Sequence, residues 1–162
     1  MIPIEVLSAA YARNLEIIKM QTHKLSHQDS LIQLPFRSNC LNWVIGHLLT
    51  NRCNILRLMD KEHLIPGQDL SHYERDSQPV IEDGEGVLPL EELVGLLEKT
   101  QLNLSTVLLG IDPEYLQRPA VYRDRPERPL IEWVFFLYFH DCYHVGQTEL
   151  LRQAAGTDDK II

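Results

Sequence analysis

The stretch from Pro129 to Gly156, PLIEWVFFLYFHDCYHVGQTELLRQAAG, decides the fold. It predicts one long helix, because proline suits the first helical position and glycine suits the left-handed residue that ends a helix. From Leu130 to Phe139, apolar side chains point in almost every direction around this helix. A helix that is apolar all round is buried on more than one side. We therefore expect this segment to be the central helix of the protein.

Two histidines, His140 and His144, stand four residues apart in the middle of this helix. Residues at this spacing share one helical face, with Cβ atoms about 5–6 Å apart. Both imidazoles can therefore reach one metal ion from a rigid backbone. The alternative is a pair of buried histidines that are hydrogen-bonded within the core, and the spacing alone leaves both interpretations open.

The length and charge of the chain restrict its class. Its 162 residues fit a single domain spanning 1–162, which is long enough to bury roughly 68–70% of the unfolded surface. Fifteen lysine and arginine residues stand against 23 aspartate and glutamate residues, so the formal net charge is −8. Nucleic acids and anionic membranes require a basic surface. We therefore expect neither as a partner.

Three cysteines, Cys40, Cys53 and Cys142, form no C-x-x-C motif and cannot all pair within one chain. Free cysteines within helices usually act as small buried apolar residues. We expect no signal peptide, because the first residues show no basic segment followed by an apolar one. No apolar run approaches the roughly 20 residues that span a bilayer. These features predict a protein of the reducing cytoplasm.

The rest of the chain predicts three further long helices, at about 3–25, 39–60 and 89–109, from apolar residues spaced three or four apart. Between the second and third lies a polar connection, 61–88, which is unusually long for a compact domain unless it is functional or crosses the fold. No segment is a convincing strand. The sequence therefore predicts an all-α four-helix bundle.

Bundles build metal sites from side chains on facing helices. His47, in the middle of the second predicted helix, is the natural third ligand beside His140 and His144. Three neutral imidazoles suit zinc, nickel, iron or cobalt and leave coordination positions for water and substrate. A structural zinc site would need a fourth protein ligand, and no cysteine is well placed to provide it.

Two neighbours of the histidine pair are candidates for supporting roles. Gln147 lies on the ligand face, where it either orients a ligand or metal-bound water or acts as an ordinary core amide. Asp141 follows His140 as glutamate follows the first histidine in H-E-x-x-H metalloproteases, where that carboxylate is the general base. Its alternative is a solvated or supporting carboxylate.

Two segments together resemble the DinB/YfiT-like superfamily of metal-dependent proteins: NWVIGHLL at 42–49 and HDCYHVGQTELLRQ at 140–153. The family pattern is W-x-x-x-H on the second helix, then H-x-x-x-H-x-G-Q and L-x-x-L-R on the fourth. The matching positions are Trp43, His47, His140, His144, Gly146, Gln147 and Arg152. The helix order and the long connection extend the resemblance to nearly the whole chain.

The resemblance implies an up-down-down-up bundle in which 61–88 is the crossover between helices two and three. It implies a divalent metal, most often nickel or zinc, held by His47, His140 and His144, with iron, cobalt or manganese as alternatives. It also implies a homodimer formed through the apolar bundle helices. Characterised relatives include S-transferases that use low-molecular-weight thiols such as bacillithiol or mycothiol, and a maleylpyruvate isomerase.

Three functions follow from these features. The first is a thiol-dependent S-transferase-like enzyme whose metal activates a thiol or water, with Gln147 and either Asp141 or Tyr143 in support. An anionic thiol would need a local basic patch, for which Arg123, Arg125 and Arg128 are candidates, although such residues also occur in ordinary solvated loops. The second is a metal-dependent hydrolase. The third is a non-catalytic, metal-binding, stress-related dimer.

Overall fold

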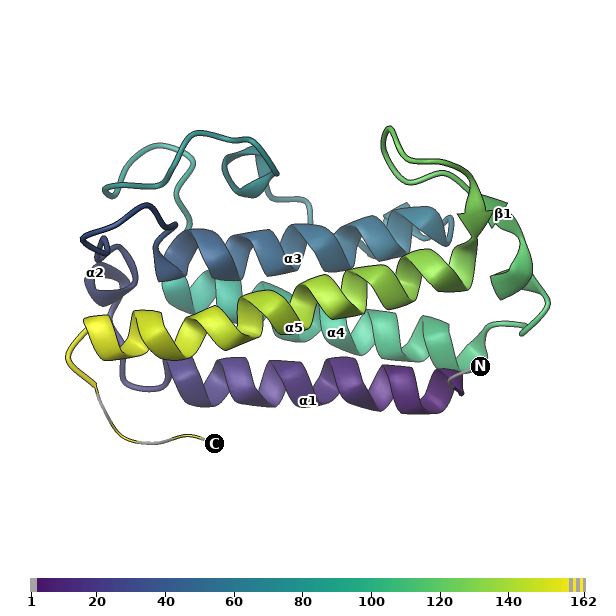
Figure 1. The fold of residues 1–162 in the computed structure, drawn as a ribbon, viewed down its shortest axis with the longest axis horizontal. Coiled ribbons are helices and arrows are strands. Elements are labelled where there is room, and N and C mark those ends of the chain that lie inside the picture. Colours follow the sequence, from purple (N-terminus) through teal and green to yellow (C-terminus); the bar gives the residue numbers. More distant parts are fainter. Residues whose placement is uncertain (1–2, 158, 160, 162) are drawn as a thin grey trace.

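The computed structural model describes residues 3–157, 159 and 161, and these are mostly helical (Figure 1). Four long helices account for most of them: α1 (Ile4–Thr22), α3 (Leu41–Leu58), α4 (Leu90–Gly110) and α5 (Leu130–Ala154). Helices α1 and α3 each pack against both α4 and α5, so every long helix has two long neighbours. The predicted all-α class is confirmed. None of the helices in the described part of the chain is long and apolar enough to cross a bilayer.

The first helix is shorter than the sequence predicted. Helix α1 ends at Thr22, and a separate short helix, α2 (His27–Ser30), follows it. The Ser26 side chain accepts a hydrogen bond from the backbone N–H of Asp29, and the Asp29 carboxylate accepts one from the Ser26 backbone. This reciprocal cap begins a new helix, which the apolar spacing of 3–25 did not indicate.

The sequence also predicted no strand, whereas the structure has a short antiparallel pair, β1 (Pro119–Ala120) and β2 (Arg128–Pro129). Two-residue strands give no alternating pattern in a sequence, because that signal needs at least four residues. The Trp133 indole N–H on α5 donates to the carbonyl of Ala120 at 2.9 Å. This contact fixes the hairpin, and with it the loop 121–127, beside the first turns of α5.

Helix α5 is not buried on every side. It packs against α1 and α3, where Trp133, Val134 and Leu137 are buried. A third face carries apolar side chains that are exposed in the single chain: Phe135 (44%), Phe139 (64%), Tyr143 (61%) and Leu150 (48%). The expectation of burial is therefore confirmed for two neighbours, and the third face has no partner within the described chain.

The connection between α3 and α4 runs back along the outer side of α3 (Figure 1) and contains two short 3-10 turns, η1 (Glu62–Leu64) and η2 (Ser71–Tyr73). Tyr73 anchors it. The ring is fully buried, its hydroxyl donates to Asn42 Oδ1 at 3.1 Å, and the same oxygen accepts from the Leu88 backbone N–H at 2.7 Å. A Cβ at Gly46 would overlap the Tyr73 ring, so only glycine lets the connection lie this close to α3.

We expect Gly46→Ala to lower the free energy of unfolding by about 1–3 kcal/mol, the usual cost of overpacking. The matched control is Gly95→Ala, at an exposed helical position of α4 where an added Cβ meets nothing within 4 Å. That control variant should have a free energy of unfolding about 0.5–1 kcal/mol higher than the wild type, because alanine favours a helix interior more than glycine does. Urea denaturation monitored by circular dichroism gives both values. Equal effects at the two positions would contradict the packing of Tyr73 on Gly46.

Candidate metal centre

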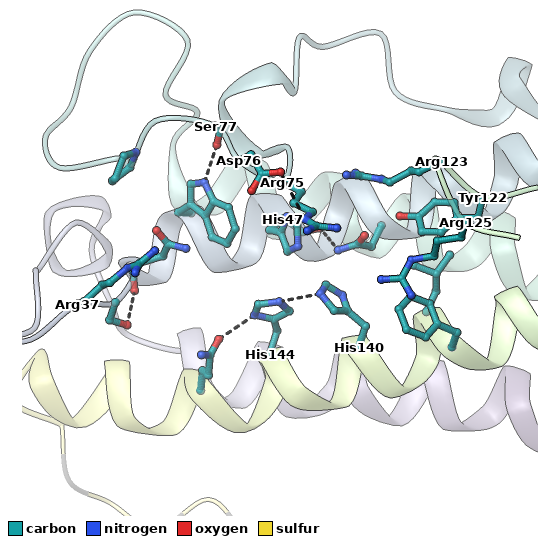
Figure 2. Close-up of a pocket in the computed structure, with 18 residues that line it drawn as sticks. Arg37, His47, Arg75, Asp76, Ser77, Tyr122, Arg123, Arg125, His140 and His144 are labelled. Carbon is teal, nitrogen blue, oxygen red and sulfur yellow. Dashed lines mark hydrogen bonds and ion pairs between the residues drawn. The ribbon is translucent and has the colours of Figure 1, made fainter.

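The structure brings the three predicted histidines together. His47 extends from α3, while His140 and His144 extend from the facing side of α5 (Figure 2). One ring nitrogen from each lies within 4.8 Å of the others. The three rings are steeply inclined to one another, with centroids 4.5 to 5.2 Å apart. This group of side chains can hold one metal ion.

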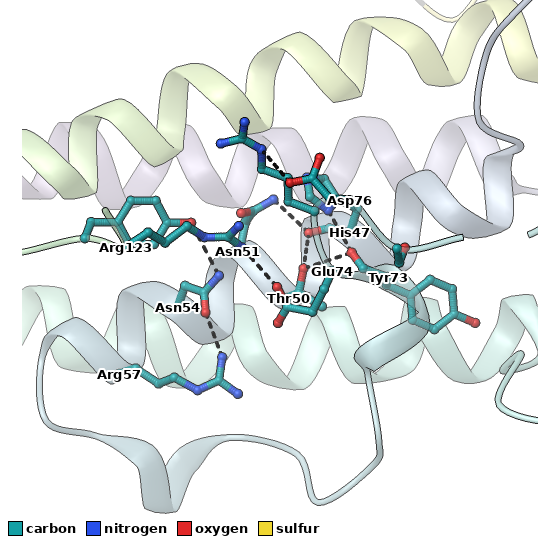
Figure 3. Close-up of polar contacts among 12 residues, drawn as sticks. His47, Thr50, Asn51, Asn54, Arg57, Tyr73, Glu74, Asp76 and Arg123 are labelled. Atoms are coloured by element: carbon teal, nitrogen blue, oxygen red, sulfur yellow. Dashed lines mark hydrogen bonds and ion pairs between the residues drawn. The ribbon is translucent and has the colours of Figure 1, made fainter. Parts of the chain in front are cut away.

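The backbone of the crossover orients His47. Its Nδ1 lies 2.8 Å from the carbonyl oxygen of Tyr73 (Figure 3), and a carbonyl can only accept. Nδ1 therefore carries the proton, which leaves a lone pair on Nε2. The Trp43 ring stacks on the imidazole at 4.5 Å and an angle of 13°. His47 is thus fixed in both tautomer and orientation, as metal-binding histidines usually are.

Gln147 gives His144 a similar support. With the amide oxygen facing the ring, Gln147 Oε1 accepts from His144 Nδ1 at 2.7 Å. The other nitrogen, Nε2, lies 3.2 Å from His140 Nε2. Two nitrogens bound to one tetrahedral zinc ion would be roughly 3.4 Å apart, given bonds of about 2.0–2.1 Å. The histidine pair on α5 therefore already has the separation that two ligands of one ion require.

His140 is not satisfied as a core histidine. Its Nδ1 is buried and has no hydrogen-bond partner in the described part of the chain, and its Nε2 faces another ring nitrogen. Buried polar atoms in proteins are nearly always hydrogen-bonded. The unpartnered Nδ1 is common to both interpretations, because a hydrogen bond to His144 and a bond to a metal ion would each use Nε2.

All three imidazoles are held in the neutral form that binds metals. Burial, with a smaller contribution from His144, lowers the pKa of His47 to about 4. Burial and the two neighbouring histidines likewise lower the pKa of His140 to about 4. The pKa of His144 is also lowered by burial, although its hydrogen bond to Gln147 acts in the opposite direction. Lone pairs are consequently available throughout the neutral pH range.

The histidines face a cavity of about 680 Å³. Its walls come from the loop before α3, from α3 and α5, from the crossover and from the hairpin tip (Figure 2). Polar and charged lining groups other than the histidines are Arg37, Ser38, Asn39, Asn51, Arg75, Asp76, Ser77, Tyr122, Arg123, Arg125 and Gln147. The volume suits a small organic molecule.

Asp141 does not face this cavity. Its carboxylate is turned into the core, where Oδ1 accepts from Arg52 Nε at 3.1 Å and Oδ2 accepts from Arg52 Nη2 at 3.0 Å. Asn14 donates to Oδ2 as well, at 2.8 Å. Both oxygens are therefore occupied, and only 1% of the residue is exposed. The geometry places Asp141 as an anchor between helices rather than as a base beside the metal ligands.

The other residues predicted to support the site differ in whether they line the cavity. Gln147 lines the cavity as predicted, whereas Tyr143 is largely exposed and touches His144 only with its ring edge, at a centroid distance of 5.3 Å. Of the three arginines, Arg123 and Arg125 reach the cavity and Arg128 does not.

Sequence reasoning missed two kinds of contributor. The first is the Tyr73 carbonyl, because any residue type can offer a backbone oxygen. The second is the pair Arg37 and Arg75, which lie in irregular segments without a periodic signal.

Comparisons with known proteins add no family assignment. The chain matches no protein-family model, and no curated protein matches it. The resemblance to the DinB/YfiT-like superfamily therefore stays a prediction that rests on the motif residues.

We expect Asp141→Asn to lower the free energy of unfolding by about 3–5 kcal/mol, because it leaves Arg52 buried without its counter-charge. Urea denaturation would measure this change. If the three histidines hold a metal ion, the folded variant should bind it with the stoichiometry of the wild type. Glu132→Gln, which alters an exposed carboxylate on the same helix, should change stability by no more than about 0.5 kcal/mol. A stable Asp141→Asn variant that loses its metal would instead assign the carboxylate a direct role at the site.

Proposed function

We propose that this chain is a metal-dependent enzyme that resembles S-transferases. In this proposal His47, His140 and His144 hold a divalent metal ion, for which nickel and zinc are the first candidates. The observation that carries the proposal is the convergence of three neutral imidazoles on one side of an open cavity. Among the described residues, the group of side chains that could hold a metal ion consists of these three histidines. Catalytic zinc sites use three protein ligands and keep a fourth position for water or substrate, whereas structural sites are closed by four.

An ion of this kind supplies Lewis acidity, which lowers the pKa of bound water to about 7 and deprotonates a bound thiol. The chain's own residues provide the support. The Tyr73 carbonyl and Gln147 keep the Nε2 atoms of His47 and His144 directed at the site. Trp43 covers one face of His47 and excludes water from it. Its indole N–H donates to Ser77 Oγ at 3.0 Å, which holds the crossover against the cavity.

The proposed architecture is the up-down-down-up four-helix bundle of the DinB/YfiT-like superfamily. The path of the chain in Figure 1 supports it, since α3 and α4 run in the same direction and the crossover between them returns along the outside of α3. A reducing cytoplasmic location is part of the same proposal. The three cysteines are free thiols, of which Cys40 and Cys53 are buried, as is usual for cysteines that serve as small apolar residues.

We expect the untagged protein, purified without chelators, to contain close to one equivalent of nickel or zinc. His140→Ala should reduce the metal content to near zero, and Gln147→Leu should weaken metal affinity about 10–100-fold, the usual effect of losing a partner that orients a ligand. His63→Ala, at an exposed histidine of the crossover, is the matched control and should retain the metal. Elemental analysis and competition with a chromophoric chelator give these values.

A wild-type protein that stays metal-free after incubation with nickel, zinc, iron, cobalt and manganese salts would overturn the three-histidine site. Given a loaded site, turnover of an electrophilic substrate that requires an added thiol supports the transferase. Hydrolysis of an ester without thiol would favour a metal-dependent hydrolase instead. Loaded protein that binds neither thiol nor any other exogenous ligand would favour a non-catalytic metal-binding role.

We also propose that two copies of the chain associate through the exposed apolar face of α5. Phe139→Glu should convert a dimer into a monomer, because a charge buried without a partner opposes association. Leu102→Glu is the control, since Leu102 is as exposed (69%) as Phe139 but lies on α4. Sedimentation equilibrium distinguishes the two variants. A wild-type monomer at micromolar concentration would contradict the proposal.

A further inference from the structure

We propose that the substrate of this site is a small organic anion and that Arg125 binds its acidic group while another atom of the substrate faces the three histidines. The inference rests on the proposed metal site and names the chemical class of its substrate. It comes from the charge of the cavity, from the lack of an acidic partner for Arg125 among the described residues and from the position of Arg125 relative to His140.

The charge of the cavity is opposite to that of the whole chain. The protein has a formal net charge of −8, yet the cavity is lined by four arginines and a single acidic residue. The arginines are Arg37, Arg75, Arg123 and Arg125. Histidine side chains carry no negative charge, so Asp76 supplies the one negative charge in this lining. Like charges gathered in a concave, low-dielectric site concentrate their field and attract the opposite charge.

Two of these arginines already have acidic partners. Arg123 Nη2 lies 3.0 Å from Glu74 Oε2, which joins the hairpin tip to the crossover (Figure 3), and Arg75 Nε lies 3.4 Å from Asp76 Oδ2. By contrast, Arg37 and Arg125 have no ion pair with a carboxylate in the described part of the chain. Of these two, Arg125 is the one that lies over an aromatic ring.

An aromatic ring holds Arg125 in place. Its guanidinium carbon lies 4.6 Å from the centroid of the Phe136 ring. A guanidinium that lies over an aromatic ring does not use its N–H groups on a carboxylate, so they remain able to form two parallel hydrogen bonds to one. Arg125 is therefore both oriented and available, the two properties that an anion-binding residue requires.

The same aromatic ring connects Arg125 to the metal ligands. Phe136 and His140 lie one helical turn apart on α5, with centroids 6.5 Å apart and planes inclined by only 22°. Arg125 and His140 consequently lie toward the same end of the cavity (Figure 2). A substrate can thus place its acidic group on the guanidinium and its other end at the histidines. A cationic substrate would meet repulsion from the two arginines without acidic partners, Arg37 and Arg125.

The test uses two small thiols of similar length, 3-mercaptopropionate, which is an anion, and 2-mercaptoethanol, which is neutral. Isothermal titration calorimetry, with each thiol added to zinc-loaded protein, gives the two dissociation constants. We expect the anion to bind at least about tenfold more tightly, in line with a hydrogen bond between charged groups. Arg125→Gln should abolish this preference. Arg128→Gln, which removes another exposed arginine of the same hairpin, outside the cavity, should leave it intact.

Equal affinity for the two thiols, failure of both to bind, or a preference that survives in Arg125→Gln would overturn the inference. Metal content is measured first in each variant, so a protein that binds no metal is recognised as a failure of the proposed function. In that case propionate is titrated into the metal-free protein, and its binding is followed by NMR through changes in the amide chemical shifts. Shifts at the residues around Arg125 that vanish in Arg125→Gln would support anion binding, and their absence would overturn it.

Discussion

The buried contact between Arg52 and Asp141 holds the arrangement together, because it joins all four long helices at one point. Arg52 on α3 donates to Asp141 on α5 and to Gln101 Oε1 on α4 at 2.7 Å, while Asn14 on α1 donates to the same carboxylate. Arg52 is fully buried. A buried charge without its partner destabilises a fold by several kcal/mol, so rotation or sliding of any one helix would be costly. The pair therefore fixes the relative register of the helices, which apolar packing alone constrains less strictly.

The candidate metal centre depends on this register. His47 precedes Arg52 on α3, and His140 directly precedes Asp141 on α5, so the two helices joined by the ion pair also supply the histidines. Each residue turns a helix by about 100°. The carboxylate that points into the core thereby directs the preceding imidazole toward the cavity. The crossover adds a further constraint, since the Tyr73 carbonyl reaches His47 only because Gly46 allows the ring to lie against α3.

Sequence reasoning succeeded where a pattern extends over several turns. The ends of α5 and the shared face of His140 and His144 follow directly from proline, glycine and the four-residue spacing. It failed where one local hydrogen bond decides the outcome, as at Ser26, whose cap begins α2, and in the two-residue strands that fix the hairpin. The inward direction of Asp141 was accessible in principle, because adjacent residues on a helix cannot share a face. The contribution of Arg125 was less accessible, because it depends on the path of an irregular loop.

The imidazoles at the site and the inward direction of Asp141 both keep negative charge away from the cavity. Carboxylate ligands would cancel much of the charge of a divalent ion, whereas three neutral imidazoles cancel none. The one acidic residue adjacent to the histidines on α5 is turned away and paired with Arg52. The positive charge without a carboxylate partner at that end of the cavity is then the Arg125 guanidinium, which lies over Phe136. In a chain whose net charge is −8, this arrangement keeps one cavity positive, and that local field favours an acidic molecule over a neutral or basic one of the same size.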